Sequence, residues 1–168
     1  ALAHDEPASN VLYHSDDYGK TWSGQTVITQ GSKNTRGYYE PCLLELRRDH
    51  LLGMHRMGAS QNQRDGLFWR NESIDGGKTW SEPVETDILS GACPRLLKLS
   101  DGRVLLTYGR RYPPYGIYAR LSSDGGKTWG ETSWLLREAP NGDQGYSSSL
   151  EIKPGRIFTT CYAQNAQA

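Results

Sequence analysis

The sequence lacks long hydrophobic runs and an excess of charge of either sign. No apolar stretch in its 168 residues approaches the roughly 20 residues that a membrane-spanning helix needs. Its 19 Lys and Arg residues balance 19 Asp and Glu residues, and the basic ones are dispersed, whereas a nucleic-acid-binding surface gathers them on one face. We therefore expect neither a membrane span nor a nucleic-acid partner.

Cysteine and histidine are also scarce, and their spacing fits no metal site. The cysteines are Cys42, Cys93 and Cys161, with no C-x-x-C pair, and the four histidines form no H-E-x-x-H pattern. Because the cysteines fall near the ends of predicted inner strands, we expect small buried apolar side chains there, not disulfide partners or metal ligands. Neither a metal nor another cofactor is expected.

No segment shows a sustained helical period. Apolar residues make up 36% of the chain, which also contains 19 Gly, 10 Tyr and 5 Trp. This composition is typical of short strands joined by many turns. It predicts an all-β protein with almost no helix.

One eight-residue pattern, Ser-x-Asp-x-Gly-x-Thr-Trp, occurs at 15–22, 73–80 and 122–129. An Asp two residues before a Gly suits a tight turn, because the carboxylate accepts backbone N–H groups and Gly adopts a positive φ. The Thr and Trp then begin a strand, and the Trp ring is expected to be buried beside the neighbouring unit. We interpret these Asp boxes as structural hairpins. Their key residues are Asp17, Asp75, Asp124, Trp22, Trp80 and Trp129.

A second repeat runs through the same chain with a different phase. Runs of alternating apolar residues begin at Leu43, Leu96 and Ser149, so the offset is 53 residues both times. Each run meets a turn and a second apolar run. A third strand follows around 67–70 and 116–120, and then an Asp box and a fourth strand. This order predicts a four-stranded antiparallel unit of about fifty residues, which is the size of a propeller blade.

The number of blades is too small for a closed ring, because propellers usually have four to eight. We expect residues 1–168 to form part of one larger β-propeller, starting late in one blade and ending partway through another. The expected blade pieces cover about 1–30, 38–88, 91–137 and 144–168.

The 53-residue offset also brings polar residues into equivalent positions. Glu40 corresponds to Cys93 and then to Tyr146, at the start of each predicted first strand, and first strands line the central channel of a propeller. Arg56 corresponds to Gly109, at the end of the second strand, which returns to the same mouth of the channel. Arg110 and Arg111 follow directly. A carboxylate, a phenol and one or two guanidinium groups are therefore expected to converge.

These groups have complementary chemistry. Guanidinium groups from different blades suit a planar anion, because each gives two parallel hydrogen bonds to a carboxylate. A phenol beside a glutamate suits a nucleophile with its base, since a neutral tyrosine becomes reactive only when its proton has an acceptor. Each residue type taken alone is common on strands and surfaces, so the shared register carries the hypothesis.

With its three Asp boxes, the Tyr-Ser-Ser-Ser-Leu run at 146–150, and Glu-Pro-Cys at 40–42 leading to Arg56, the chain resembles sialidases of the Asp-box (BNR-repeat) superfamily. The resemblance implies a six-bladed propeller that releases terminal sialic acid from glycoconjugates by a retaining mechanism. It implies Tyr146 as the nucleophile and Glu40 as its activating partner. It also implies Arg56, with Arg111 or alternatively Arg110, as ligands of the sugar carboxylate.

Two parts of the family pattern are not found. The first arginine and the acid/base aspartate normally precede all the boxes, so both are expected to lie outside this chain, which alone is expected to be inactive. Asp5 is similar to an acid/base segment but belongs to the wrong blade. A secreted, periplasmic or cell-surface parent is favoured.

Two alternative functions remain. The first is an Asp-box propeller that binds or cleaves another glycan, because the boxes indicate hairpin structure and not substrate. The second is a structural propeller that binds proteins on its rim.

Overall fold

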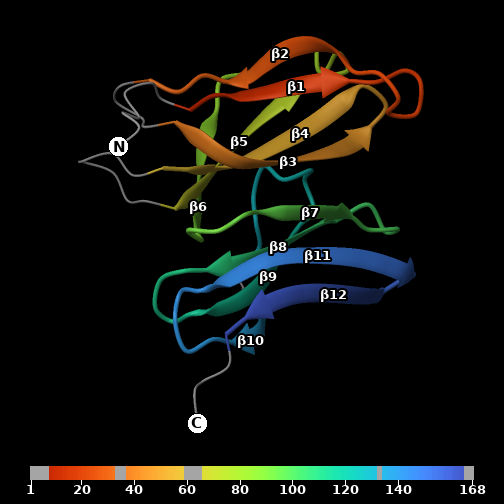
Figure 1. Ribbon diagram of the computed structural model, residues 1–168. Coiled ribbons are helices and arrows are strands. Elements are labelled where there is room, and N and C mark those ends of the chain that lie inside the picture. The colour runs from red at the N-terminus through yellow and green to blue at the C-terminus, as the bar shows by residue number, and fades with distance from the viewer. Residues whose placement is uncertain (1–7, 33–36, 59–65, 132–133, 165–168) are drawn as a thin grey trace.

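The computed structural model describes residues 8–32, 37–58, 66–131 and 134–164, which form twelve strands and no helix (Figure 1). No helix long and apolar enough to cross a membrane occurs in these ranges. The strands are β1 (Asn10–His14), β2 (Ser23–Thr29), β3 (Tyr38–Arg47), β4 (His50–Met57), β5 (Leu67–Ser73), β6 (Val84–Leu89), β7 (Arg95–Lys98), β8 (Val104–Arg110), β9 (Gly116–Ser122), β10 (Trp134–Glu138), β11 (Gln144–Lys153) and β12 (Arg156–Ala163).

The strands form four antiparallel sheets, and the strands of each sheet are consecutive in the chain. Two sheets have four strands, in the orders β3-β4-β5-β6 and β7-β8-β9-β10, and two have only two strands, β1-β2 and β11-β12. The prediction of an all-β fold with four-stranded antiparallel propeller blades is confirmed, and the chain contains an incomplete set of them.

The first strand of each sheet lies next to the first strand of the following sheet. β3 contacts β7, and β7 contacts β11. All three run in the same direction in Figure 1. Because the remaining strands of each four-stranded sheet follow in order away from this row, β3, β7 and β11 form the inner edge of the array, as in a propeller.

The Asp boxes lie at the end of the sheets opposite the starts of β3 and β11. In the β3–β6 sheet, Ser73 at the start of the box pairs with Leu51 beside the β3–β4 turn. The amide of Gly76 also donates to the carbonyl of Asp49 in that turn at 2.9 Å. Glu40, near the start of β3, is at the other end of the same sheet.

Each box has the same set of hydrogen bonds. The carboxylate of Asp17 accepts from the Thr21 hydroxyl at 2.7 Å, the Thr21 amide at 2.9 Å and the Ser15 hydroxyl at 2.8 Å. These bonds favour the ionised carboxylate and lower the pKa of Asp17 to about 2. Gly19 has a φ of 83°. The other two boxes repeat these contacts, and the pKa values of Asp75 and Asp124 are likewise about 2, although burial opposes the shift at Asp124.

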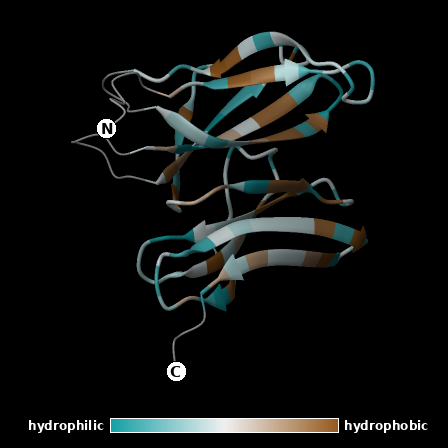
Figure 2. Ribbon diagram, in the orientation of Figure 1, coloured by the Kyte–Doolittle hydropathy of each residue, from teal (hydrophilic) through white to brown (hydrophobic). Residues whose placement is uncertain are grey.

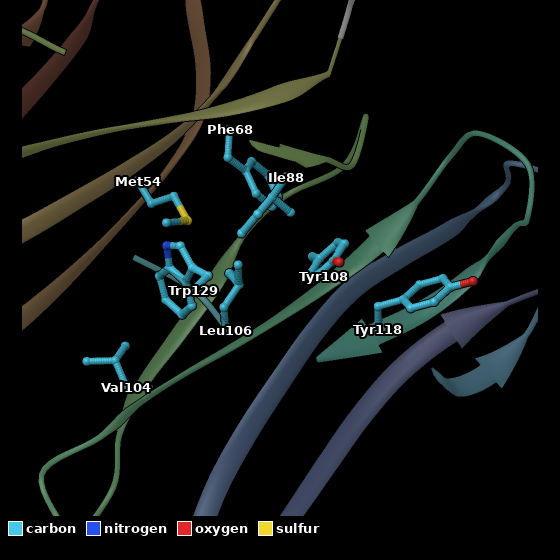
Figure 3. Packing of buried hydrophobic residues seen from close by; sticks show 8 residues of the cluster. All are labelled: Met54, Phe68, Ile88, Val104, Leu106, Tyr108, Tyr118 and Trp129. Atoms are coloured by element: carbon cyan, nitrogen blue, oxygen red, sulfur yellow. The ribbon is translucent and has the colours of Figure 1, made fainter. Parts of the chain in front are cut away.

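The three box tryptophans differ in burial. Trp129 is only 9% exposed and packs with Met54, Val104 and Leu106 between the two complete sheets (Figure 3). Trp80 is half-buried against Gly53, where an added Cβ would lie 3.2 Å from its ring. Trp22 is 64% exposed, so the expectation that it is buried is wrong.

The exposure of Trp22 follows from how the boxes pack. Each box lies on the sheet that precedes its own: Gly126 lies against Leu52 of β4, and Gly77 lies against Leu12 of β1. The box that contains Trp22 follows β1, and no sheet precedes β1 in the described part of the chain. Its indole therefore lacks the surface that covers Trp129.

The cysteines differ in the same way. Cys93 is buried and Cys42 is half-buried, but Cys161 is exposed on β12, so the expectation of three buried thiols is wrong for this residue. β12 belongs to a two-stranded sheet, and the described residues place no further strand beside it. Figure 2 shows that β11, the strand paired with β12, is pale over most of its length and apolar only toward its end.

A buried polar network joins the β1-β2 sheet to its neighbour. His55 is fully buried, with Asn10 Nδ2 at 2.9 Å from Nδ1 and Asn71 Oδ1 at 2.9 Å from Nε2. Asn71 donates in turn to the carbonyl of Ile28 at 2.8 Å. An amide donor on one nitrogen and a carbonyl acceptor on the other require a neutral ring protonated on Nε2. Burial lowers the pKa of His55 to about 4.

We predict that Trp129→Ala lowers the free energy of unfolding by about 3–5 kcal/mol, because it leaves a cavity between two sheets. Ile74→Ala is the matched control, since Ile74 lies in a box loop and is 76% exposed, and its effect is expected to stay within about 0.5 kcal/mol. Denaturant unfolding of both variants provides the measurement. Equal effects would contradict the packing role of the box tryptophan.

Acid is expected to destabilise the fold through His55. The folded-state pKa of about 4 lies below the ordinary value of 6.5, so the unfolded chain binds the proton first. Stability from this group is complete above pH 6.5 and falls toward pH 4, by on the order of 3 kcal/mol in total. The box carboxylates act only at lower pH. Unfolding measured across this range should lose its pH slope in His55→Gln and keep it in His14→Gln, which removes an exposed imidazole.

Candidate active site

Glu40 and Tyr146 occupy equivalent bulges near the starts of β3 and β11. The β3–β4 ladder shifts register between Tyr39 and Cys42, and the β11–β12 ladder shifts between Gly145 and Ser148. The φ angles are 50° at Glu40 and 48° at Tyr146, in the left-handed region that side-chain-bearing residues rarely adopt. Bulges of this kind redirect a side chain out of the regular alternation of a strand. Both side chains are therefore aimed by the same local distortion.

The structure brings these two side chains and Arg56 into one chain of contacts. The Tyr146 hydroxyl donates to Glu40 Oε1 at 3.2 Å, and Arg56 Nε donates to Glu40 Oε2 at 2.8 Å. The side chains of Glu40 and Arg56 are 22% and 20% exposed. Tyr146 is 46% exposed. The carboxylate thus uses one oxygen for the phenol and the other for a guanidinium group, and the phenol remains accessible.

Arg111 joins this group and Arg110 does not. The guanidinium carbon of Arg111 lies 5.7 Å from the centroid of the Tyr146 ring, and its Nε donates to the carbonyl of Gln144 at 3.3 Å. Arg110 donates instead to the carbonyl of Pro113 in its own loop at 3.1 Å. Consecutive residues of an extended chain point to opposite sides, which separates the two arginines.

The intervening blade presents small residues at this mouth. Cys93, which corresponds to Glu40 and Tyr146 in the repeat, is buried with its sulfur 3.9 Å from the Glu40 carbonyl oxygen. At Gly109 an added Cβ would come within 2.6 Å of Gln144 Oε1 and 2.9 Å of Gly145 Cα. Small side chains in this blade therefore allow residues two blades apart to touch.

Two aromatic residues at the site were not identified from the sequence. The ring of Tyr162 stacks on that of Tyr146 at 5.9 Å between centroids, and its hydroxyl donates to Asp143 at 2.8 Å, which raises its pKa. The ring of Tyr39 lies 5.2 Å from the guanidinium carbon of Arg56. The 53-residue offset contains the missed signal, because it relates Arg56 to Gly109 and then to Tyr162.

The site contains charges of both signs. Arg56 pairs with the Glu40 carboxylate, and Arg111 lies over the Tyr146 ring. Asp143 accepts from the Tyr162 hydroxyl, and the carboxylates of the three Asp boxes lie at the other end of the sheets. Asp5 lies outside the described residues, as does the rest of the segment before Ala8. The described part of the chain contains no cluster of three His, Cys, Asp or Glu side chains that could hold a metal ion.

Comparisons with known proteins agree with this fold. The family model for the BNR repeat-like domain matches residues 3–158. No curated protein matches the chain. A protein of unknown function from Dyadobacter fermentans is 26% identical with a TM-score of 0.80, over 94% of this chain and 42% of that protein. The NanB sialidase of Streptococcus pneumoniae is 21% identical with a TM-score of 0.63, over 88% of this chain and 23% of the sialidase.

Both solved relatives are much longer than the segment they share with this chain, which spans less than half of either. The likeness to the sialidase concerns the fold. The family match covers most of the sequence and agrees with the repeated hairpins and the antiparallel blades. The chain therefore belongs to the BNR repeat-like domain family.

Proposed function

We propose that this segment forms the nucleophile side of a retaining exo-sialidase active site, which releases terminal sialic acid from glycoconjugates. The observation that carries the proposal is the hydrogen bond from the Tyr146 hydroxyl to Glu40 Oε1, with Arg56 on the other carboxylate oxygen and Arg111 beside the phenol ring. Tyr146 is the nucleophile, Glu40 its base, and Arg111 and Arg56 attract the substrate carboxylate.

The charge of the substrate explains why a phenol serves here. Sialic acid carries a carboxylate on its anomeric carbon, so an attacking Asp or Glu would meet a like charge at close range. A neutral phenol avoids this repulsion until its proton leaves, and Glu40 lies within hydrogen-bond distance to accept that proton. The arginines thus attract the negative charge of the substrate, and the neutral tyrosine is not repelled by it.

In the first step the Tyr146 oxygen attacks the anomeric carbon, the bond to the leaving oxygen breaks, and Glu40 takes the phenolic proton. A separate acid protonates the leaving oxygen. In the second step water attacks the same carbon and gives a proton to the conjugate base of that acid. The bond to the Tyr146 oxygen breaks, the proton returns from Glu40 to the phenol oxygen, and the configuration is retained. Glu40 accepts the phenolic proton in the first step, so a group other than Glu40 supplies the proton of the leaving oxygen.

A glycan-binding propeller without this activity is the second candidate. The Asp boxes and the antiparallel blades fit it equally well, because they determine the hairpins and not the chemistry. Substrate class follows from the site and not from the fold, so the two candidates differ in whether Tyr146 reacts.

If Tyr146 is the nucleophile, its substitution should lower turnover without lowering the affinity for sialic acid. The test uses a protein in which this segment is joined to the remaining blades of the propeller. Glu40→Gln should lower kcat by about 10²–10⁴-fold because the amide cannot accept the proton. Tyr146→Phe should lower it at least as much and keep the affinity for sialic acid, since little contact area is removed. Steady-state kinetics with a fluorogenic sialoside and calorimetry with sialic acid measure the two effects.

The control for these variants is Tyr13→Phe, which removes a hydroxyl from an exposed tyrosine on β1. It should leave both quantities unchanged. Near-parental kcat in Tyr146→Phe would reject Tyr146 as the nucleophile. Binding of sialic acid without any turnover in the unsubstituted protein would instead support the glycan-binding candidate.

If Arg111 binds the substrate carboxylate and Arg110 does not, replacing each of them by alanine should lower the affinity for sialic acid by different amounts. Arg111→Ala should weaken sialic acid binding at least tenfold, which corresponds to about 1.4 kcal/mol. Arg110→Ala removes the same charge one residue away, where the side chain bonds Pro113, and should have a much smaller effect. Calorimetry on both variants, with melting temperatures to check folding, decides between them. Equal losses would indicate a general charge effect and contradict a specific contact.

A further inference from the structure

The hydrogen bond to Glu40 fixes the hydroxyl of Tyr146 but not the plane of its ring. At 3.2 Å it is longer than ordinary O–H···O bonds of about 2.5–3.0 Å. The side chain also leaves a bulge with a φ of 48°, and the ring turns about two side-chain bonds. Because a displacement of about 1 Å can slow a reaction about 10²-fold, a nucleophile needs its ring held as well as its oxygen.

Tyr162 of β12 provides this support. The ladder pairs its backbone with Gly145, the residue before Tyr146. The two rings are nearly parallel, with 5.9 Å between their centroids and an angle of 20° between their planes. Aromatic rings attract one another in such stacked arrangements, at centroid distances of about 4.5–7 Å. The bulge therefore places the ring of Tyr146 beside a ring of the paired strand.

Asp143 holds the hydroxyl end of Tyr162. Its Oδ1 accepts from the Tyr162 hydroxyl at 2.8 Å, and its Oδ2 accepts from the side-chain amide of Gln164 at 2.5 Å. Asn141 completes the cluster, because its Oδ1 accepts from the Asp143 amide at 2.8 Å and its Nδ2 donates to Gln164 Oε1 at 3.0 Å. Both carboxylate oxygens of Asp143 therefore have donors within this segment, which fixes the direction of the carboxylate.

Arg111 connects this support to the groups that attract the substrate carboxylate. Its guanidinium carbon lies 5.7 Å from the centroid of the Tyr146 ring. It also acts on the neighbouring phenol, because Asp143 raises the pKa of Tyr162 through their hydrogen bond and the charge of Arg111 opposes that shift. Tyr162 thus keeps its proton more firmly than an ordinary phenol, which suits a supporting ring and not a second nucleophile.

We infer that Tyr162 is a positioning residue for the nucleophile and that Asp143 holds it in place, a role that rests on the proposed function of Tyr146. The Tyr162 ring limits the rotation of the Tyr146 ring, so that the phenol oxygen stays within reach of Glu40 and of the anomeric carbon. Tyr162 itself touches no reacting atom. Its loss should therefore affect the rate of attack more than the binding of the sugar.

The first test compares kcat with affinity in the protein that joins this segment to the remaining blades. Tyr162→Ala removes the stacked ring and should lower kcat by about 10–100-fold, while the dissociation constant of sialic acid changes by less than about threefold. Tyr162→Phe keeps the ring and loses the bond to Asp143, so its loss of kcat should be smaller, about three- to tenfold.

Phe158→Ala is the matched control, because Phe158 is another aromatic residue of β12. Its exposed fraction is 54%, compared with 40% for Tyr162, and the guanidinium carbon of Arg156 lies over its ring, 5.4 Å from the centroid. This variant should keep the parental kcat and affinity. Melting temperatures of all the variants show whether a loss of turnover follows from a loss of folding.

Asp143→Ala tests whether Asp143 and Tyr162 act as one unit. It should lose about as much kcat as Tyr162→Phe, and combining the two substitutions should add little, since each breaks the same hydrogen bond. The loss should be equal with an aryl sialoside, whose leaving group needs little protonation, and with an alkyl sialoside, whose leaving group needs it. A larger loss with the alkyl sialoside would show that Asp143 donates a proton and would contradict a positioning role.

Tyr146→Phe separates the positioning role from the proposed function. Turnover that survives in Tyr146→Phe, or that is absent from the unsubstituted protein, rejects the proposed function and the positioning role with it. If Tyr146→Phe is inactive and folded Tyr162→Ala keeps the parental kcat, only the positioning role is wrong. A loss in Tyr162→Phe as large as that in Tyr146→Phe would make Tyr162 a reacting group, and equal losses of kcat and affinity in Tyr162→Ala would make it a binding residue. Either result overturns the proposal.

Discussion

The packing of one sheet on the next is the interaction on which the rest of the structure depends. A four-stranded blade has two faces and cannot bury either within itself, so the apolar side chains of β4, β5, β8 and β9 are covered only where two blades meet. Trp129 reaches across this contact from its box to Met54. The Asp box hydrogen bonds fix the turn that carries the indole, which couples a short local motif to the contact between blades.

The same packing sets the geometry of the candidate site. Glu40 and Tyr146 hold positive φ angles that cost on the order of 1–3 kcal/mol each, and such backbone persists only when its surroundings impose it. Here the ladders β3–β4 and β11–β12 continue on both sides of each bulge. The corresponding residue of the intervening blade, Cys93, has no positive φ angle. The strained backbone therefore occurs at the two positions that carry the candidate catalytic side chains and not at the one between them.

Sequence periodicity predicted more of the fold than of the site. The 53-residue offset identified the blades and the convergence of Glu40 with Tyr146, because both follow from strand order. It also relates Tyr162 to Arg56 and so places this residue at the mouth, but the stacking of Tyr162 on Tyr146 depends on side-chain rotamers and not on register. The exposure of Trp22 and Cys161 was missed for another reason. Burial depends on which sheet lies alongside, and a local pattern contains no information about that neighbour.

Because the site is divided among blades, it forms only when they pack. Glu40 and Arg56 belong to one complete sheet, Arg111 follows the second strand of the next, and Tyr146 lies on β11. Cys93 and Gly109 are small enough to let these groups meet across the blade between them. A larger residue there would push β11 away from β3 and break the bond between phenol and carboxylate without altering either residue. Residues that make no contact with a ligand thus determine whether the tyrosine has a base.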